Sequence, residues 1–140
     1  MWVIYALLAA LAGAVMATLT KVGLKGVDSS VGLAVESVLI LLFAWGMVAF
    51  QGQLGQLADV DRRSLVYLVL AGVVAGASSL FLYRALKLGN ASRVVPLDRL
   101  SLVFAILLGS VFLKEKVGWQ VIVGGALMAV GALTIASASE

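Results

Sequence analysis

Five long apolar runs, separated by short polar connections, make up almost the whole chain. Each run has about the 20 helical residues needed to cross the roughly 30 Å hydrocarbon core of a bilayer. Because lipid offers backbone N–H and C=O groups no water, such runs are expected to form helices. The expected helices are about Val3–Thr20, Val31–Phe50, Leu65–Leu86, Val94–Leu113 and Trp119–Ala136. The sequence therefore predicts an all-α integral membrane protein with five transmembrane helices in a single domain, residues 1–140.

Composition supports the membrane class and excludes several functions. Hydrophobic residues make up 63% of the chain and charged residues 12%, whereas soluble domains are about half apolar and a quarter charged. The ten Lys and Arg residues lie mainly in the connections, as membrane topology requires, so the net charge of +3 does not indicate nucleic-acid binding. The chain has no cysteine and no histidine, which excludes thiol chemistry and the usual zinc and haem sites.

Catalytic motifs are also missing from the sequence. It has no glycine-rich phosphate loop, no nucleophile paired with a base and no carboxylate pair with metal-binding spacing. We therefore expect no enzyme activity, no metal and no cofactor.

The segment Tyr83–Arg99 is a polar, basic hinge between two apolar runs. Arg84 is expected near the end of one helix, which Gly89–Asn90 then breaks. Ser92 can cap the next helix, which would place Pro96 in its first turn, where the missing N–H matters little.

Ionisable residues inside the apolar runs are the main candidates for function. Glu36 and Arg99 each lie about six residues into runs that start from the same membrane side, so both are expected roughly 9 Å deep. A Glu36–Arg99 pair is feasible, with Asp98 and Arg84 as competing partners. Such a pair could form a gate or a substrate and proton site. It could equally fix helix register, or the side chains could snorkel to the interface.

Hydroxyl and aromatic side chains add to these candidates. Ser79 and Tyr83 lie near the same membrane side and could line a cavity or bond neighbouring helices. Trp45 is deeper than an interfacial anchor and could also line a cavity. The candidate substrate and coupling residues are Glu36, Asp98, Arg99, Tyr83, Arg84, Ser79 and Trp45.

Small residues form stripes that allow close helix approach, most clearly in the fifth run. The stripe contains Gly118, Gly125, Ala129, Ala132 and Ala136. Packing within the bundle is one interpretation, and a contact between two copies of the chain is the other.

The basic residues are divided almost evenly between the two membrane sides. One side receives Arg62, Arg63, Lys114 and Lys116, and the other receives Lys21, Lys25, Arg84, Lys87 and Arg93. A protein of fixed orientation usually has a clear cytoplasmic excess. The balance predicts dual topology, with two copies in opposite orientations forming an inverted pair. A single orientation set by other details is the alternative.

Two segments resemble the EamA domain of the drug/metabolite transporter superfamily. One runs from Tyr83-Arg84-Ala85-Leu86 through Ala91-Ser92 to Pro96, and the other contains Phe112-Leu113-Lys114-Glu115 followed by Gly124, Leu127 and Gly131. Glu36 departs from the family, in which a basic or neutral residue is common there. The resemblance implies one five-helix repeat, half of an inverted-repeat ten-helix transporter fold that an antiparallel homodimer would complete.

The resemblance also implies a function. We expect a secondary transporter that moves a small organic solute across a bacterial or archaeal cytoplasmic (inner) membrane by alternating access. Proton-coupled export is expected, because Glu36 or Asp98 could carry the proton. The alternatives are a component of a lipid-linked-sugar flippase and a structural membrane protein without transport.

Overall fold

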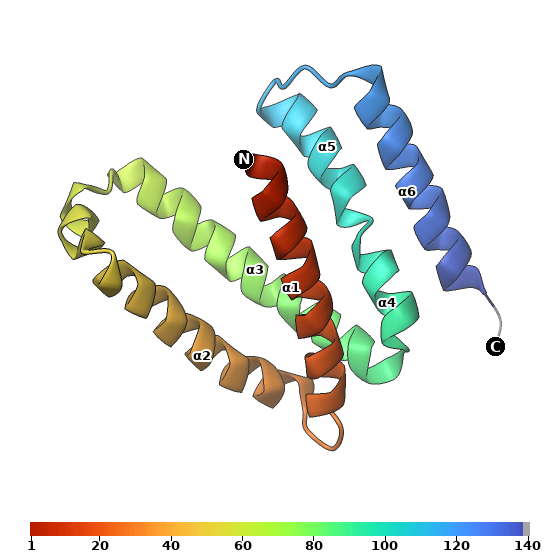
Figure 1. Cartoon of the computed structure of the whole chain (residues 1–140), viewed down its shortest axis with the longest axis horizontal. Coiled ribbons are helices and arrows are strands. Elements are labelled where there is room, and N and C mark those ends of the chain that lie inside the picture. Colours follow the sequence, from red (N-terminus) through yellow and green to blue (C-terminus); the bar gives the residue numbers. More distant parts are fainter. Residues whose placement is uncertain (139–140) are drawn as a thin grey trace. The chain divides into compact units, whose positions relative to one another are not determined.

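Helices account for nearly all of the computed structural model, which describes residues 1–138 (Figure 1). Within those residues, five stretches are long and apolar enough to cross a membrane, which confirms the predicted number of spans. The helices are α1 (Trp2–Gly23), α2 (Ser29–Phe50), α3 (Arg62–Leu88), α4 (Ala91–Asp98), α5 (Ser101–Phe112) and α6 (Trp119–Ser137), with a 3₁₀-helix η1 (Gln53–Asp59).

The chain consists of two compact units. One unit is Thr18–Lys87, which contains the end of α1, α2, η1 and most of α3. The other combines Met1–Ala17 with the described residues from Leu88 onward, and contains the rest of α1 with α4, α5 and α6.

The fourth span begins earlier than predicted. Asn90 has extended backbone angles (φ −72°, ψ 136°) and is the N-cap of α4. Ser92, predicted as the cap, is the second residue of the helix, and Pro96 is the sixth and not part of the first turn. Both Asn and Ser favour the N-cap position, so the sequence offered two starts and the earlier one is used.

The fourth span is also two helices, where one helix over Val94–Leu113 was predicted. Arg99 and Leu100 separate α4 from α5. The Leu100 N–H donates to the Leu97 carbonyl at 3.0 Å, a three-residue spacing that tightens the turn. Pro96, three residues before Arg99, has no backbone N–H to donate, so one hydrogen bond of α4 is already missing just before the break.

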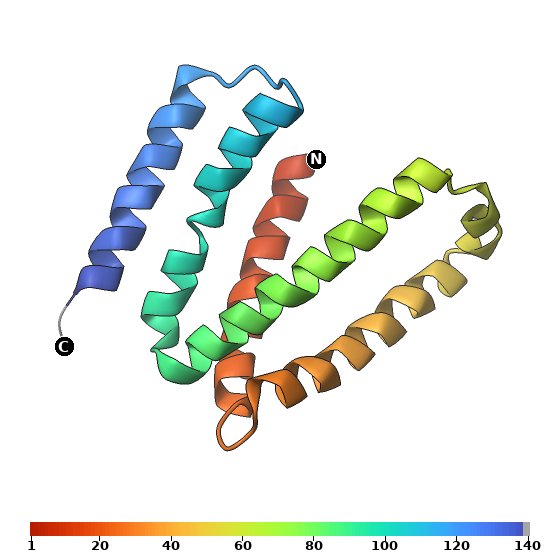
Figure 2. The same ribbon diagram turned by 180° about the vertical axis from the view of Figure 1, so that it is seen from behind.

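Both α4 and α5 pack against α6, as the view from behind also shows (Figure 2). A Cβ added to Gly125 would lie 3.0 Å from Ile106 Cδ1, so this glycine allows α5 to approach α6 closely. Ala132, seven residues on, is also buried. The packing interpretation of the fifth-run stripe is confirmed at Gly125 and Ala132. The face at these two positions is covered within the chain, and the dimer-contact interpretation of the stripe stays a prediction.

The connection between α5 and α6 is an irregular loop. Lys114 has a positive φ of 54°, which ends α5 in the left-handed conformation common after a helix. The Glu115 N–H then donates to the Gly109 carbonyl at 3.3 Å. An earlier connection, between α2 and α3, contains the 3₁₀-helix η1, which was not predicted from the sequence.

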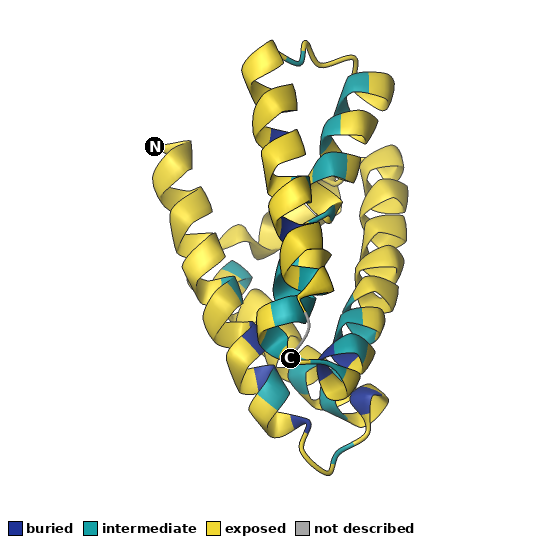
Figure 3. Cartoon of the chain, turned by 90° about the vertical axis from the view of Figure 1, so that its right-hand side faces the viewer, coloured by how far each residue is buried: buried dark blue, intermediate teal, exposed yellow. Residues whose placement is uncertain are grey.

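Most of the helical surface is exposed in the isolated chain (Figure 3). No residue in the most apolar stretch of α2 or of α3 is buried. These helices therefore present nearly all of their apolar side chains to lipid or to another protein, and internal burial is concentrated near Leu86 and Tyr83.

Candidate functional site

Glu36 is the centre of a polar cluster formed by three helices of the Thr18–Lys87 unit. Its Oε2 accepts a hydrogen bond from the hydroxyl of Tyr83 on α3. The same oxygen accepts one from Thr20 Oγ1 on α1, at 3.4 Å. A membrane-embedded carboxylate is costly unless it is paired or hydrogen-bonded, and the two hydroxyl donors supply this stabilisation.

The donors around Glu36 are more buried than the carboxylate itself. Tyr83 is 3% exposed and Thr20 is 9% exposed, whereas Glu36 is half-buried. Next to Thr20, the Lys21 ammonium donates to the carbonyl of Leu86, a fully buried residue in the last turn of α3. The carboxylate therefore has a fixed protein side, formed by α1 and α3, and a side that remains accessible.

Sequence reasoning identified Glu36 and Tyr83 separately, and the structure brings them together. It missed Thr20 and Lys21. A depth count could have found Thr20, because it lies three residues before the end of α1, and Tyr83 lies five before the end of α3. At about 1.5 Å per residue, both lie within roughly 8 Å of the membrane side at which α2, the helix of Glu36, begins.

Asp28, also missed, begins α2 and lies outside the membrane spans. Its carboxylate accepts the Ser30 N–H at 2.9 Å, which caps the helix. Hydrogen bonds from Ser30 hold the pKa of Asp28 below its ordinary value of 3.8, and the positive charges of Lys87 and Arg84 lower it further. Arg84, a predicted site residue, is exposed and acts on Asp28 from the end of α3.

Ser79 and Trp45 lie on the same helices as Tyr83 and Glu36, at other positions along them. Ser79 is half-buried on α3, one turn before Tyr83. Trp45 is 48% exposed on α2, nine residues past Glu36, which corresponds to about 13 Å along the helix. Trp45 therefore lies away from the Glu36 cluster, and roles for both residues stay predictions.

Asp98 and Arg99 belong to the other unit, at the junction of α4 and α5, and both are exposed. The Arg99 guanidinium lies over Gly13 of α1, where an added Cβ would be 3.4 Å from its Nη2. Gly13 thus makes room for a charged group. The Glu36–Arg99 pair stays a prediction.

Acidic and metal-ligating side chains are scattered along the chain. Among residues 1–138, no three of the His, Cys, Asp and Glu side chains lie close enough together to hold a metal ion.

Residues 1–137 match the EamA-like transporter family. The chain belongs to this family. A protein named an uncharacterised transporter in the cobO 3′ region, from a Sinorhizobium species, is 39% identical over 135 residues, which cover 96% of both chains. An uncharacterised protein of Methanocaldococcus jannaschii is 33% identical over 75 residues, 54% of this chain and 55% of that protein. No solved structure matches.

The family membership confirms the resemblance seen in the sequence. Together with the five spans, it identifies a multi-pass membrane protein of a transporter family, and it favours transport over catalysis.

Proposed function

We propose that this EamA-like domain is a secondary transporter that exports a small organic solute in exchange for protons. The observation that carries the proposal is the Glu36 carboxylate, held inside a membrane span by hydroxyls from two other helices. An ionisable group at membrane depth is a functional candidate by default. Its one accessible side gives a proton or a cationic group a route to it.

The cluster supplies hydrogen-bond donors that match a charged carboxyl group. A charged carboxylate only accepts hydrogen bonds, which matches the Tyr83 and Thr20 donors. After protonation, the carboxyl group carries an O–H donor of its own and has less capacity to accept hydrogen bonds from Tyr83 and Thr20. Binding of a proton and binding of a solute at the same carboxylate would then compete, which is the requirement for exchange.

We further propose that two copies in opposite orientations form the working transporter of ten helices. The even division of basic residues supports this arrangement. So do the unburied surfaces of α2 and α3, which leave room for a partner. In such a dimer, the two inverted Glu36 regions, with Arg99 as the predicted partner, would close opposite mouths in turn.

Proton flux in proteoliposomes tests the transport proposal. Vesicles loaded with a pH-sensitive dye are challenged with a panel of amino acids, small metabolites and amphiphilic cations, and solute-driven pH changes are recorded. We expect at least one class to drive proton movement through the wild-type protein, and Glu36→Gln to abolish it.

Asp59→Asn is the matched control, because it removes an exposed carboxylate from η1 outside the spans. Proton flux that persists in Glu36→Gln at the wild-type rate would contradict the role of Glu36. Absence of flux with every solute class, in protein that is correctly inserted, would favour the structural alternative.

A further inference from the structure

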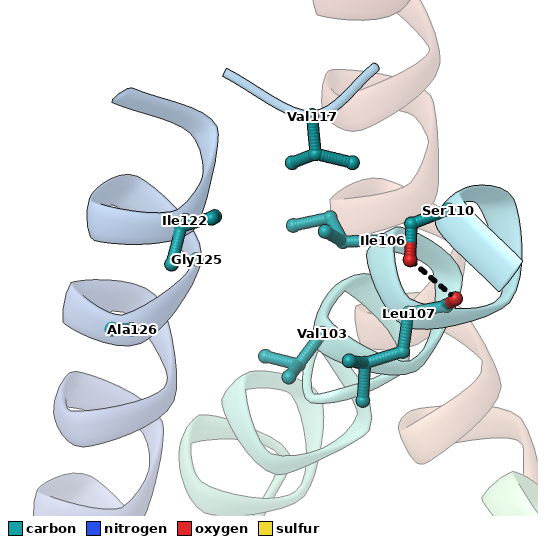
Figure 4. A pocket seen from close by; sticks show the side chains of 8 residues that line it. All are labelled: Val103, Ile106, Leu107, Ser110, Val117, Ile122, Gly125 and Ala126. Carbon is teal, nitrogen blue, oxygen red and sulfur yellow. Dashed lines mark hydrogen bonds between the residues drawn. The ribbon is translucent and has the colours of Figure 1, made fainter. Parts of the chain in front are cut away.

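A groove runs between α5 and α6 beneath their connecting loop, in the unit that does not contain Glu36 (Figure 4). Its volume is about 400 Å³. The residues that line it are Val103, Ile106, Leu107, Ser110, Val117, Ile122, Gly125 and Ala126.

The groove is apolar along its whole length. Its one polar side chain, Ser110, donates its hydroxyl to the Leu107 carbonyl at 2.8 Å, so this donor is already used within α5. From Val103 to Ser110 the lining extends over about two turns of helix, roughly 10 Å. A hydrocarbon chain fits such a surface, whereas a polar solute would find few hydrogen-bond partners.

The groove has a lysine-bearing loop at one end. Val117 forms its upper wall, and the exposed side chains of Lys114 and Lys116 precede it in the same loop. The intervening Glu115 lies against α5: its Oε2 would be 3.2 Å from a Cβ added to Gly109, the residue before the lining residue Ser110. Trp119, 71% exposed at the start of α6, is placed as an interfacial anchor.

We propose that this groove is a binding site for an anionic phospholipid of the surrounding bilayer. One acyl chain lies along Ile106 and Ile122, and the phosphate contacts Lys114 and Lys116 at the interface. The complementarity of a phosphate with two lysines of the loop that adjoins this apolar channel selects this occupant over a neutral lipid. The proposal goes beyond the transport function and does not depend on it.

Photolabelling tests the site without knowledge of any substrate. The protein is reconstituted in bilayers containing phosphatidylglycerol or phosphatidylcholine with a photoactivatable group in the acyl chain, and labelled residues are mapped by mass spectrometry. Labelling at Val73 and Val74, exposed on α3, provides the internal reference for nonspecific lipid contact. Relative to that reference, we expect phosphatidylglycerol to label the groove at least fivefold more than phosphatidylcholine.

Charge removal then tests the lysines. Each lysine near an anionic headgroup contributes about fivefold in affinity, so Lys114→Gln with Lys116→Gln should remove the preference, to which the two lysines together contribute up to ~30-fold. The control is Arg62→Gln with Arg63→Gln, which removes the same charge at the same membrane side from the start of α3. This control should leave groove labelling unchanged. Ala126→Phe, which fills the groove, should remove labelling by both lipids.

Three results would overturn the proposal. Equal labelling of the wild-type groove by the two lipids would show ordinary lipid contact only. A preference for phosphatidylglycerol that survives the loss of both lysines would place the headgroup elsewhere. Groove residues that crosslink to a second copy, with no lipid label, would make the groove a subunit contact.

Discussion

The hydrogen bond from Tyr83 to Glu36 leads to a quantitative prediction for Tyr83→Phe. The substitution removes the hydroxyl and keeps the ring, so the packing of a residue that is 3% exposed is retained. Hydrogen bonds to charged groups contribute about 1.5–3 kcal/mol. The remaining donor, Thr20, is at 3.4 Å, close to the limit for a hydrogen bond, and cannot replace the lost one.

We therefore expect Tyr83→Phe to lower the free energy of unfolding by about 1.5–3 kcal/mol. Reversible unfolding in mixed micelles of mild detergent and sodium dodecyl sulfate, followed by circular dichroism, measures this change. Tyr67→Phe is the matched control, because Tyr67 lies on the same helix and is 73% exposed. It should change stability by less than about 0.5 kcal/mol.

A double-mutant cycle with Glu36→Gln isolates the pair. A coupling energy of about 1 kcal/mol or more between the two substitutions is expected, since residues in one hydrogen-bond network are non-additive. If Tyr83→Phe behaves like Tyr67→Phe, or if its effect simply adds to that of Glu36→Gln, the cluster does not hold the carboxylate and the reasoning fails.

Three other predictions concern the packing, the cap and the topology. Gly125→Leu should destabilise the α5–α6 hairpin by about 1–3 kcal/mol, because the Cβ of the new leucine meets Ile106. Gly124→Leu is the control and should be tolerated, because a Cβ at Gly124 has no neighbour within 4 Å. Equal effects of the two substitutions in thermal melts would contradict this packing. Asp28→Ala should lower the melting temperature at pH 7 and Asp28→Asn should not, because asparagine also caps helices. The pKa of Asp28 is lowered in the folded state, so the charged carboxylate stabilises the fold above pH 3.8 and this stabilisation is lost as the pH falls through the folded-state pKa. Thermal melts of the wild-type protein between pH 5 and pH 2 should therefore show a falling melting temperature. C-terminal reporters active on opposite sides of the membrane should both give signal for a dual-topology chain, and signal from one side only would exclude it.

The spans were predictable because lipid imposes both their length and their helical backbone. The break at Arg99 and Leu100 was not, because the apolar pattern continues through it and the effect of Pro96 depends on where α4 begins. Asn90 and Ser92 are both good caps, and sequence alone does not choose between them.

The candidate site was predictable only in part. Glu36 is conspicuous as a charge in an apolar run, and Tyr83 as a polar aromatic near a helix end. Thr20 resembles any threonine at the edge of a span, since its role depends on the rotation of α1 about its own axis. That rotation is set by packing and not by the sequence of the helix itself.

The exposed surfaces of α2 and α3 have a consequence for how this protein behaves in a cell. The chain's own contacts near Tyr83 and Leu86 join the helices at one end, and their middle sections are unburied. Lipid tails are as apolar as these side chains, so the bilayer supplies solvation but little force to orient them. If contacts with a second copy orient α2 and α3, the stability of the protein depends on the number of copies per membrane area. Dilution in lipid would then act on this protein as a denaturant acts on a soluble one.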